Sequence, residues 1–217
     1  IRHILTRHEQ SAAHMADGFG RVSRKPGVCF ATSGPGATNI LTGIATAQAD
    51  SSPMVAVTGQ VPVAMIGKDA FQESDIIGMA NPVVKYAFQP RTPGEVPEMV
   101  KKGFYIAETG RPGPVLIDVP KDVQQNESPM EFPEEFKIQG YHPWYDPDMV
   151  ACEKAIEMLL NSEKPIILAG GGTIISSAFA ELQSIAETLM IPVVTTFKGK
   201  GAFPENHPLS LGPIGMH

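Results

Sequence analysis

Short apolar runs rich in β-branched residues alternate with helix-like segments along the chain, and this alternation constrains the fold more than any other feature. Four runs in the first 120 residues have the composition of buried strands: GVCFAT (27–32), PMVAVTG (53–59), VVKYAF (83–88) and PVLIDVP (114–120). Small or apolar residues at helical spacing fill the segments between them. The pattern predicts an α/β fold with a mainly parallel sheet flanked by helices.

A change of composition between residues 121 and 147 indicates a domain boundary. Prolines, acidic residues and aromatic residues replace the periodic apolar ones there, which is typical of a linker that crosses a domain surface. Before it, residues 94–110 predict a packing helix that ends at a glycine. After it, we expect a helix near 148–161, a strand at 165–172, a helix near 176–190 and a strand at 191–197. This second alternating unit predicts a βαβ unit that opens another domain.

The overall composition argues against several classes of protein. A hydrophobic content of 42% supports a core, and the net charge of −6 comes without a cluster of basic residues. These values argue against nucleic acid or an anionic membrane as a partner. No apolar run has the length of a membrane span and no secretory signal is visible, so we expect a cytoplasmic protein. Cys29 and Cys152 are predicted to be buried thiols rather than a disulfide.

Two glycine-rich turns directly follow predicted strands. They are ATSGPGATN (31–39) and AGGGTIIS (169–176). Glycines at a strand-to-helix turn let a ligand approach the backbone, and the new helix offers unpaired N–H groups. The first turn lacks a Walker lysine and the second does not complete G-x-G-x-x-G. Each turn therefore has two interpretations, a ligand-binding turn or a tight turn that needs glycine for its dihedral angles.

Glu9 lies in RHEQSAAHMADGFGR (7–21), where a helical pattern begins after the strand-like run IRHILT (1–6). A carboxylate in the first turn of a helix interacts favourably with the helix dipole, by ~0.5 kcal/mol, so this stretch alone favours a structural charge. His8 and His14 lack the i, i+4 spacing of metal ligands and no third ligand is near. The sequence therefore predicts no metal site in this chain.

The remaining candidates are a long loop and two charged residues. Residues 57–75, VTGQVPVAMIGKDAFQESD, leave a strand and carry Phe71 and Gln72. Such loops often carry function, although a plain surface loop explains the pattern equally well. Arg111 precedes and Lys121 follows the run PVLIDVP, either as solvated strand ends or as anion contacts at an interdomain cleft.

Six motifs, in this order and spacing, closely resemble the large catalytic subunit of the acetolactate synthase (acetohydroxyacid synthase) family: RHEQSAAHMADGFGR, ATSGPGATN, VTGQVP, DAFQE, GRPGPVLIDVPKDV and GMH. The resemblance spans essentially the whole chain. It implies a pyrimidine-binding domain of thiamine-diphosphate enzymes over residues 1–123, without its first strand and helix. A linker at 124–147 and the start of a Rossmann-like, FAD-binding central domain at 148–217 follow. The resemblance also implies an excerpt that lacks the diphosphate-binding domain and is inactive by itself.

The implied activity is that of a thiamine-diphosphate-dependent carboligase, a transferase of branched-chain amino-acid biosynthesis. It decarboxylates pyruvate and condenses the hydroxyethyl-thiamine-diphosphate carbanion with a second 2-oxo acid. Pyruvate gives 2-acetolactate and 2-oxobutanoate gives 2-aceto-2-hydroxybutyrate. The implied cofactors are thiamine diphosphate, FAD, and Mg²⁺ bound by a domain not in this chain. A homodimer or homotetramer of the complete subunit is implied, and a small regulatory subunit is a further candidate partner.

Other interpretations remain open on the same scaffold. They are a sulfoacetaldehyde acetyltransferase, an oxo-acid decarboxylase, a pyruvate oxidase and a non-catalytic cofactor-binding module.

Carried onto this sequence, the resemblance makes Glu9 the glutamate that hydrogen-bonds the aminopyrimidine ring and activates the cofactor. It implies that Phe71 and Gln72 face the active-site channel and that Lys121 draws in the substrate carboxylate. Where relatives commonly have T-L-M-G-L-G, residues 195–201 are TTFKGKG, with lysines at two usually apolar positions. The implied thiamine diphosphate contacts are Glu9, Thr32, Pro35, Asn39 and Gln72. The implied FAD contacts are Arg111, Gly170, Gly171, Thr196, Phe197, Lys198, Met216 and His217.

Overall fold

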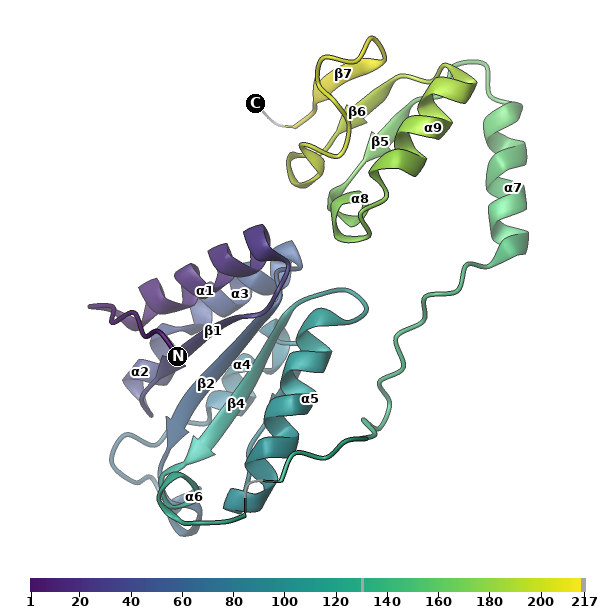
Figure 1. The fold of residues 1–217 in the computed structure, drawn as a ribbon. Helices are drawn as coiled ribbons and strands as arrows, with labels where there is room; N and C mark the ends of the chain where they lie inside the picture. The colour runs from purple at the N-terminus through teal and green to yellow at the C-terminus, as the bar shows by residue number, and fades with distance from the viewer. Residues whose placement is uncertain (130, 216–217) are drawn as a thin grey trace. The chain divides into compact units, whose positions relative to one another are not determined.

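A computed structural model describes residues 1–129 and 131–215 of the chain (Figure 1). The chain divides into two compact units, one over Ile1–Tyr145 and one that begins at Asp146. Each unit contains a parallel sheet and helices, which confirms the predicted fold class.

The first unit contains four strands and six α-helices in the part of the chain that the structure describes. The strands are β1 (Gly27–Ala31), β2 (Met54–Gln60), β3 (Tyr86–Phe88) and β4 (Pro114–Pro120). The helices are α1 (Glu9–Ser23), α2 (Pro35–Asn39), α3 (Leu41–Asp50), α4 (Ile76–Ala80), α5 (Val96–Glu108) and α6 (Lys121–Gln125), with short 3₁₀ turns at Val63–Met65, Asn81–Val83 and Pro93–Glu95.

The sheet of the first unit has the strand order β1-β2-β4-β3, and all its pairs are parallel. Every residue of β4 is buried, as expected for a parallel strand covered on both faces. Helices α1 and α3 lie on one face and α5 on the other (Figure 1). The core is therefore double, with Ile44 and Leu116 on the α1 and α3 side and Ile106 and Ile117 on the α5 side.

Small residues bring α1 and α3 into close contact. Ala13 of α1 is fully buried, and a Cβ added at Gly43 of α3 would lie 2.5 Å from the Ala13 Cβ. Helix α1 begins at Glu9 because the His8 side chain caps it: the Nδ1 of His8 accepts a hydrogen bond from the Gln10 N–H at 3.1 Å. This packing and capping fix the start of α1 beside the end of β1.

The segment expected to be a linker packs on the first unit as far as Tyr145. The Tyr141 hydroxyl donates to the Thr109 carbonyl at 2.8 Å, and the Gly110 N–H donates to the Tyr145 hydroxyl at 2.9 Å. These aromatic side chains hold the segment against the end of α5.

Some details differ from the sequence-based expectations. Residues 1–6, expected to be strand-like, form no strand and are mostly exposed; the edge strand β1 pairs only with β2 among the described residues. The expected strand at 83–88 is shortened to β3, since Val83 belongs to a 3₁₀ turn and residues 84 and 85 form no strand. Cys152 is exposed rather than buried, and both thiols are free.

The second unit has a small sheet with the order β5-β6-β7. Its core includes Ala169, Ala186, Val193, Ala202 and Phe203. Among the described residues, no helix is long and apolar enough to cross a membrane. The unit's elements are α7 (Met149–Leu160), β5 (Ile167–Ala169), α8 (Gly171–Ile175), α9 (Phe179–Leu189), β6 (Val193–Thr195), a 3₁₀ turn at Phe197–Gly199 and β7 (Ser210–Pro213).

Candidate functional site

The Glu9 carboxylate lies beside the glycine turn that follows β1. The Asn39 side-chain N–H donates to Glu9 Oε2 at 3.1 Å. A Cβ added at Gly36 would lie 3.4 Å from Glu9 Oε1 and 2.7 Å from Thr32 Cγ2. The structure therefore brings Glu9, Thr32 and Asn39 together around Gly36. The Asn39 hydrogen bond, followed by a backbone hydrogen bond, lowers the pKa of Glu9 below 4.5, which favours the ionised carboxylate.

The same turn is in contact with the loop that carries Gln72. Gly34 has φ +62°, a conformation that side chains rarely adopt, and a Cβ there would lie 2.8 Å from the Gln72 carbonyl oxygen. Pro35 follows as the first residue of α2. The main chain of Gln72 thus packs directly on Gly34. We call this group the glycine-turn site; its residues are Glu9, Thr32, Gly34, Pro35, Gly36, Asn39 and Gln72.

Phe71 and Lys121 stand apart from this group. The Phe71 side chain is 89% exposed, and Lys121 is an exposed residue at the start of α6. Within the described part of the chain, no hydrogen bond or ion pair joins either residue to Glu9. Both remain candidates for contact with a substrate rather than members of the preformed site.

A buried carboxylate near the glycine-turn site was not predicted. Asp118 in β4 is 0% exposed. Its oxygens accept hydrogen bonds from Thr58 Oγ1 at 2.6 Å, Gln60 Nε2 at 3.0 Å and Gln89 Nε2 at 2.8 Å. Burial raises the pKa of Asp118, and the three donors act in the opposite direction. The available signal was the single charge inside the apolar run PVLIDVP.

In the second unit, several predicted FAD contacts gather at the carboxyl ends of β5 and β6. The Thr196 N–H donates to the Ala169 carbonyl at 2.9 Å, and a Cβ at Gly171 would lie 3.2 Å from the Lys198 Cβ. Gly170 precedes α8. Phe197 is 84% exposed, and Met216 and His217 lie outside the described residues. Carboxyl ends of parallel strands are the usual position of ligands in α/β folds.

Arg111, also a predicted FAD contact, covers the end of α3 in the first unit. Its Nε donates to Ser51 Oγ at 2.7 Å, and its Nη2 lies 3.5 Å from the Gln48 carbonyl and 3.4 Å from that of Ala49. A cation at the C-terminus of a helix stabilises the helix through its dipole. This role needs no ligand.

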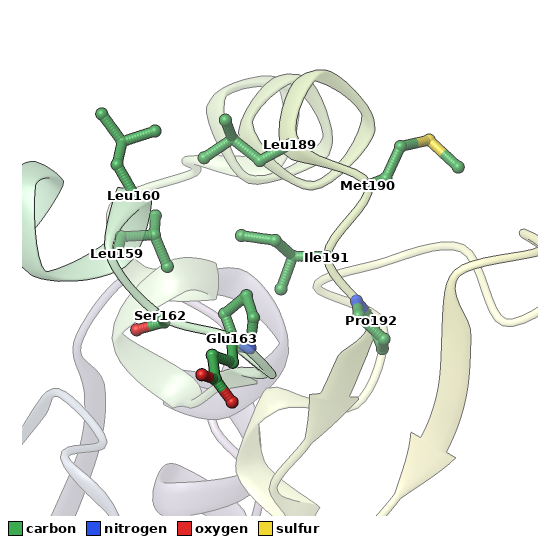
Figure 2. A pocket seen from close by; sticks show the side chains of 9 residues that line it. Leu159, Leu160, Ser162, Glu163, Leu189, Met190, Ile191 and Pro192 are labelled. Carbon is green, nitrogen blue, oxygen red and sulfur yellow. The ribbon is translucent and has the colours of Figure 1, made fainter.

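A groove in the second unit contains none of the predicted site residues. It has a volume of about 430 Å³ and lies between the ends of α7 and α9. Leu160 and Leu189 border it, with Glu163 as the charged side chain (Figure 2). The described residues contain no group of three or more potential metal ligands. The glycine-turn site is therefore the stronger candidate for chemistry.

Comparison with known families finds a match over the part of the chain that contains the glycine-turn site. Residues 1–79 match the model described as "Thiamine pyrophosphate enzyme, N-terminal TPP binding domain", and residues 152–217 match "Thiamine pyrophosphate enzyme, central domain". The chain belongs to the thiamine pyrophosphate (thiamine diphosphate) enzyme family. All residues of the glycine-turn site lie within the first match.

Individual relatives narrow the similarity to one branch of that family. The chain is 56% identical to the probable acetolactate synthase large subunit of Methanocaldococcus jannaschii over 99% of its length. It is 50% identical to the acetolactate synthase of Arthrospira platensis and 48% identical to the large subunit from Corynebacterium glutamicum, each over 100% of its length. The resemblance expected from the motifs is confirmed. The chain spans 37%, 38% and 35% of these relatives, respectively.

Proposed function

We propose that the glycine-turn site binds the aminopyrimidine ring of thiamine diphosphate and that this chain forms part of an acetolactate synthase catalytic subunit. One observation carries the proposal: the Glu9 carboxylate lies beside a glycine turn, inside the segment that matches a thiamine pyrophosphate binding domain. The names of the relatives support the particular activity.

The residues present fit such a ring. Because Gly36 has no side chain, nothing at this position fills the space between Thr32 and the Glu9 carboxylate. Asn39 orients the carboxylate through its hydrogen bond to Oε2. The ionised Glu9 carboxylate would then accept a hydrogen bond from a ring nitrogen and stabilise a proton on that nitrogen, which is acid–base work for a positioned carboxylate. When bound, thiamine diphosphate would supply the nucleophilic carbon needed for addition to the ketone of a 2-oxo acid.

The proposed reaction decarboxylates pyruvate and joins the remaining two-carbon unit to pyruvate or 2-oxobutanoate. Gln72 lies on the glycine turn and Phe71 projects from the same loop, so both are proposed to line the substrate channel. The exposed Lys121 is proposed to attract the substrate carboxylate. The complete subunit is proposed to be cytoplasmic and to act as a homodimer or homotetramer, with a small regulatory subunit as a further partner.

FAD is proposed to bind at the carboxyl ends of β5 and β6. The supporting observation is that Gly170, Gly171, Thr196 and Lys198 meet there, with Phe197 exposed beside them. Met216 and His217 are further proposed contacts. Mg²⁺ is proposed to be held by a domain outside this chain.

The test is an assay of the full-length protein with pyruvate, thiamine diphosphate, Mg²⁺ and FAD. We expect acetolactate to form in step with the release of carbon dioxide. Acetaldehyde without acetolactate would instead identify a decarboxylase, and acetyl phosphate would identify an oxidase or acetyltransferase. Cofactor binding without turnover of any 2-oxo acid would identify a binding module. Each of these three results contradicts the proposal.

A further inference from the structure

The loop that carries Gln72, residues 61–75, is ordered by two carboxylates, Asp122 of α6 and Glu73 of the loop itself. The Val63 N–H lies 3.1 and 3.2 Å from the two carboxylate oxygens of Asp122. Glu73 accepts hydrogen bonds from the N–H groups of Gly67 and Ala70, the second at 2.9 Å. These contacts connect the loop to α6 and bring Glu73 to residues 67 and 70, although none of them connects Gln72 to the sheet.

The connection from the second half of the loop to the sheet runs through Gln60. The side-chain Nε2 of Gln60, at the end of β2, donates to the Ser74 carbonyl at 2.9 Å and to Asp118 Oδ2 at 3.0 Å. Its Oε1 accepts from the Val61 N–H at 2.9 Å. One buried amide therefore joins the base of the loop, its far end and a central strand.

Asp118 fixes the orientation of that amide. Its other neighbours, the Thr58 hydroxyl and the Gln89 Nε2, also act as donors, so a carboxylate that only accepts hydrogen bonds matches all three groups. A rotated Gln60 amide would place its oxygen against the carboxylate, which is unfavourable in a buried position. The Nε2 atom is thereby held toward both Asp118 and Ser74.

Gln72 lies two residues before Ser74 and has little freedom of its own. Its φ of +59° is in the left-handed region, where a non-glycine residue needs support from its surroundings. The Gln72 main chain lies within 2.8 Å of where a Cβ at Gly34 would stand. Displacement of the Ser74 carbonyl would therefore move Gln72 away from the glycine turn.

We propose that Gln60 is a positioning residue: its bond to the Ser74 carbonyl, anchored by Asp118, holds Gln72 against Gly34 in the glycine-turn site. The proposal concerns the position of the loop, and only its consequence for catalysis rests on the proposed function. If the network only stabilised the fold, replacement of either of its two glutamines would have the same effect on the loop. Gln60 and Gln89 each donate one hydrogen bond to Asp118 Oδ2, but only Gln60 also bonds Ser74.

The matched pair Gln60→Met and Gln89→Met tests this difference. Each variant removes one amide donor from Asp118. We expect hydrogen exchange of the amides at residues 67–74 of the full-length protein to accelerate about tenfold in Gln60→Met and less than about twofold in Gln89→Met. Equal acceleration in both variants, or none in Gln60→Met, would overturn the proposal. If Gln60→Met does not fold, the pair Gln60→Asn and Gln89→Asn makes the same comparison while keeping an amide at each position.

A second readout concerns turnover in the full-length enzyme. We expect kcat/KM for pyruvate to fall about tenfold or more in Gln60→Met, because small misplacements of site residues are costly, and to change less than about twofold in Gln89→Met. Equal losses in both variants would contradict the positioning role. Absence of pyruvate turnover in the unmodified protein would remove the proposed function, while the exchange comparison would still decide the role of Gln60.

Discussion

The two units of the chain build similar parallel sheets but bury them to different extents. In the first unit every residue of β4 is buried, and Leu116 is 0% exposed. In the second unit the central strand β6 is also buried, but β5 buries only Ala169, and its Leu168 is 56% exposed. Helix α7 has no buried residue. Because buried apolar area is the main source of stability, we expect the first unit to be the more stable of the two.

The difference extends to the two proposed binding regions. The glycine-turn site is attached to α1, whose Ala13 packs closely on Gly43 of α3. The proposed flavin contacts stand at the ends of three-residue strands above a small core. A rigid arrangement suits a site that must hold a carboxylate in place for proton transfer. The second region has fewer packed neighbours to restrain it.

The largest expected difference between the units is in the reactivity of their thiols, since each unit contains one cysteine. Cys29 in β1 is 3% exposed, and burial raises its pKa to about 12; Cys152 on α7 is exposed. We expect iodoacetamide to modify Cys152 at least ~10³ times faster than Cys29 under native conditions, since Cys29 reacts only after opening. Mass spectrometry over time measures both rates, with urea-unfolded chain as the control. Comparable native rates would remove the contrast between the units.

Truncation of one leucine in each sheet tests the same contrast by stability. Leu116→Ala should lower the free energy of unfolding of the first unit by about 3 kcal/mol, because it leaves a cavity in the core. Leu168→Ala should cost the second unit less than about 0.5 kcal/mol, because that side chain is largely in solvent. Urea denaturation of each variant measures the loss. Equal losses would mean that the second sheet is as tightly packed as the first.

Glycine-to-alanine changes test how closely the helices pack. Gly43→Ala should destabilise the first unit by about 2 kcal/mol, since its new methyl group meets Ala13. Gly18 in α1 and Gly172 in α8 have no atoms within 4 Å of an added Cβ. Alanine at either position should stabilise its unit by roughly 0.5 to 1 kcal/mol through helix propensity. Thermal unfolding distinguishes these signs, and a neutral Gly43→Ala would show that α1 and α3 are not in close contact.

The smallest expected effect is the pH dependence of the stability that one carboxylate contributes in each unit. The pKa of Glu9 is lowered below its ordinary value, mainly by the hydrogen bond from Asn39. The pKa of Glu187 is lowered too, first by a hydrogen bond from Gln183 and second by one from His207. Such a group contributes stability above its unfolded pKa and loses this contribution as the pH falls through its folded pKa. The stability deficits of Glu9→Gln and Glu187→Gln should therefore be present at pH 7 and shrink as the pH falls through the lowered pKa of each carboxyl. A deficit that stays constant over this range would contradict the assigned hydrogen bonds.

Local periodicity was sufficient to predict the strands and helices of the interior. The run at 114–120 is the buried strand β4, and residues 94–110 contain α5. The failures concern features set by tertiary neighbours. Residues 1–6 have strand-like composition but no strand neighbour in the described structure, and the exposure of Cys152 depends on what covers α7.

The candidate site was less accessible to such reasoning. The residues around Glu9 alone predict only a charge at the start of a helix. The resemblance to a known family indicated its role in cofactor activation. The structure adds that Asn39, thirty residues away, bonds its carboxylate. The network of Asp118 was missed because its donors come from two other segments, the end of β2 and the residue after β3. Arg111 was expected to contact FAD, yet its contact with Ser51 gives it a helix-end role that no local pattern indicates.

The central claim is that Glu9 activates thiamine diphosphate, and exchange of the cofactor's C2 proton with solvent tests it most directly. Quenched exchange followed by NMR would compare the full-length protein with its Glu9→Gln variant. The control is Glu95→Gln, a change of the same type in the capping box before α5. We predict that Glu9→Gln slows exchange by ~10² to 10⁴, the usual contribution of a positioned proton-transfer group, and that the control leaves it unchanged. Exchange at the unmodified rate in Glu9→Gln would contradict the account.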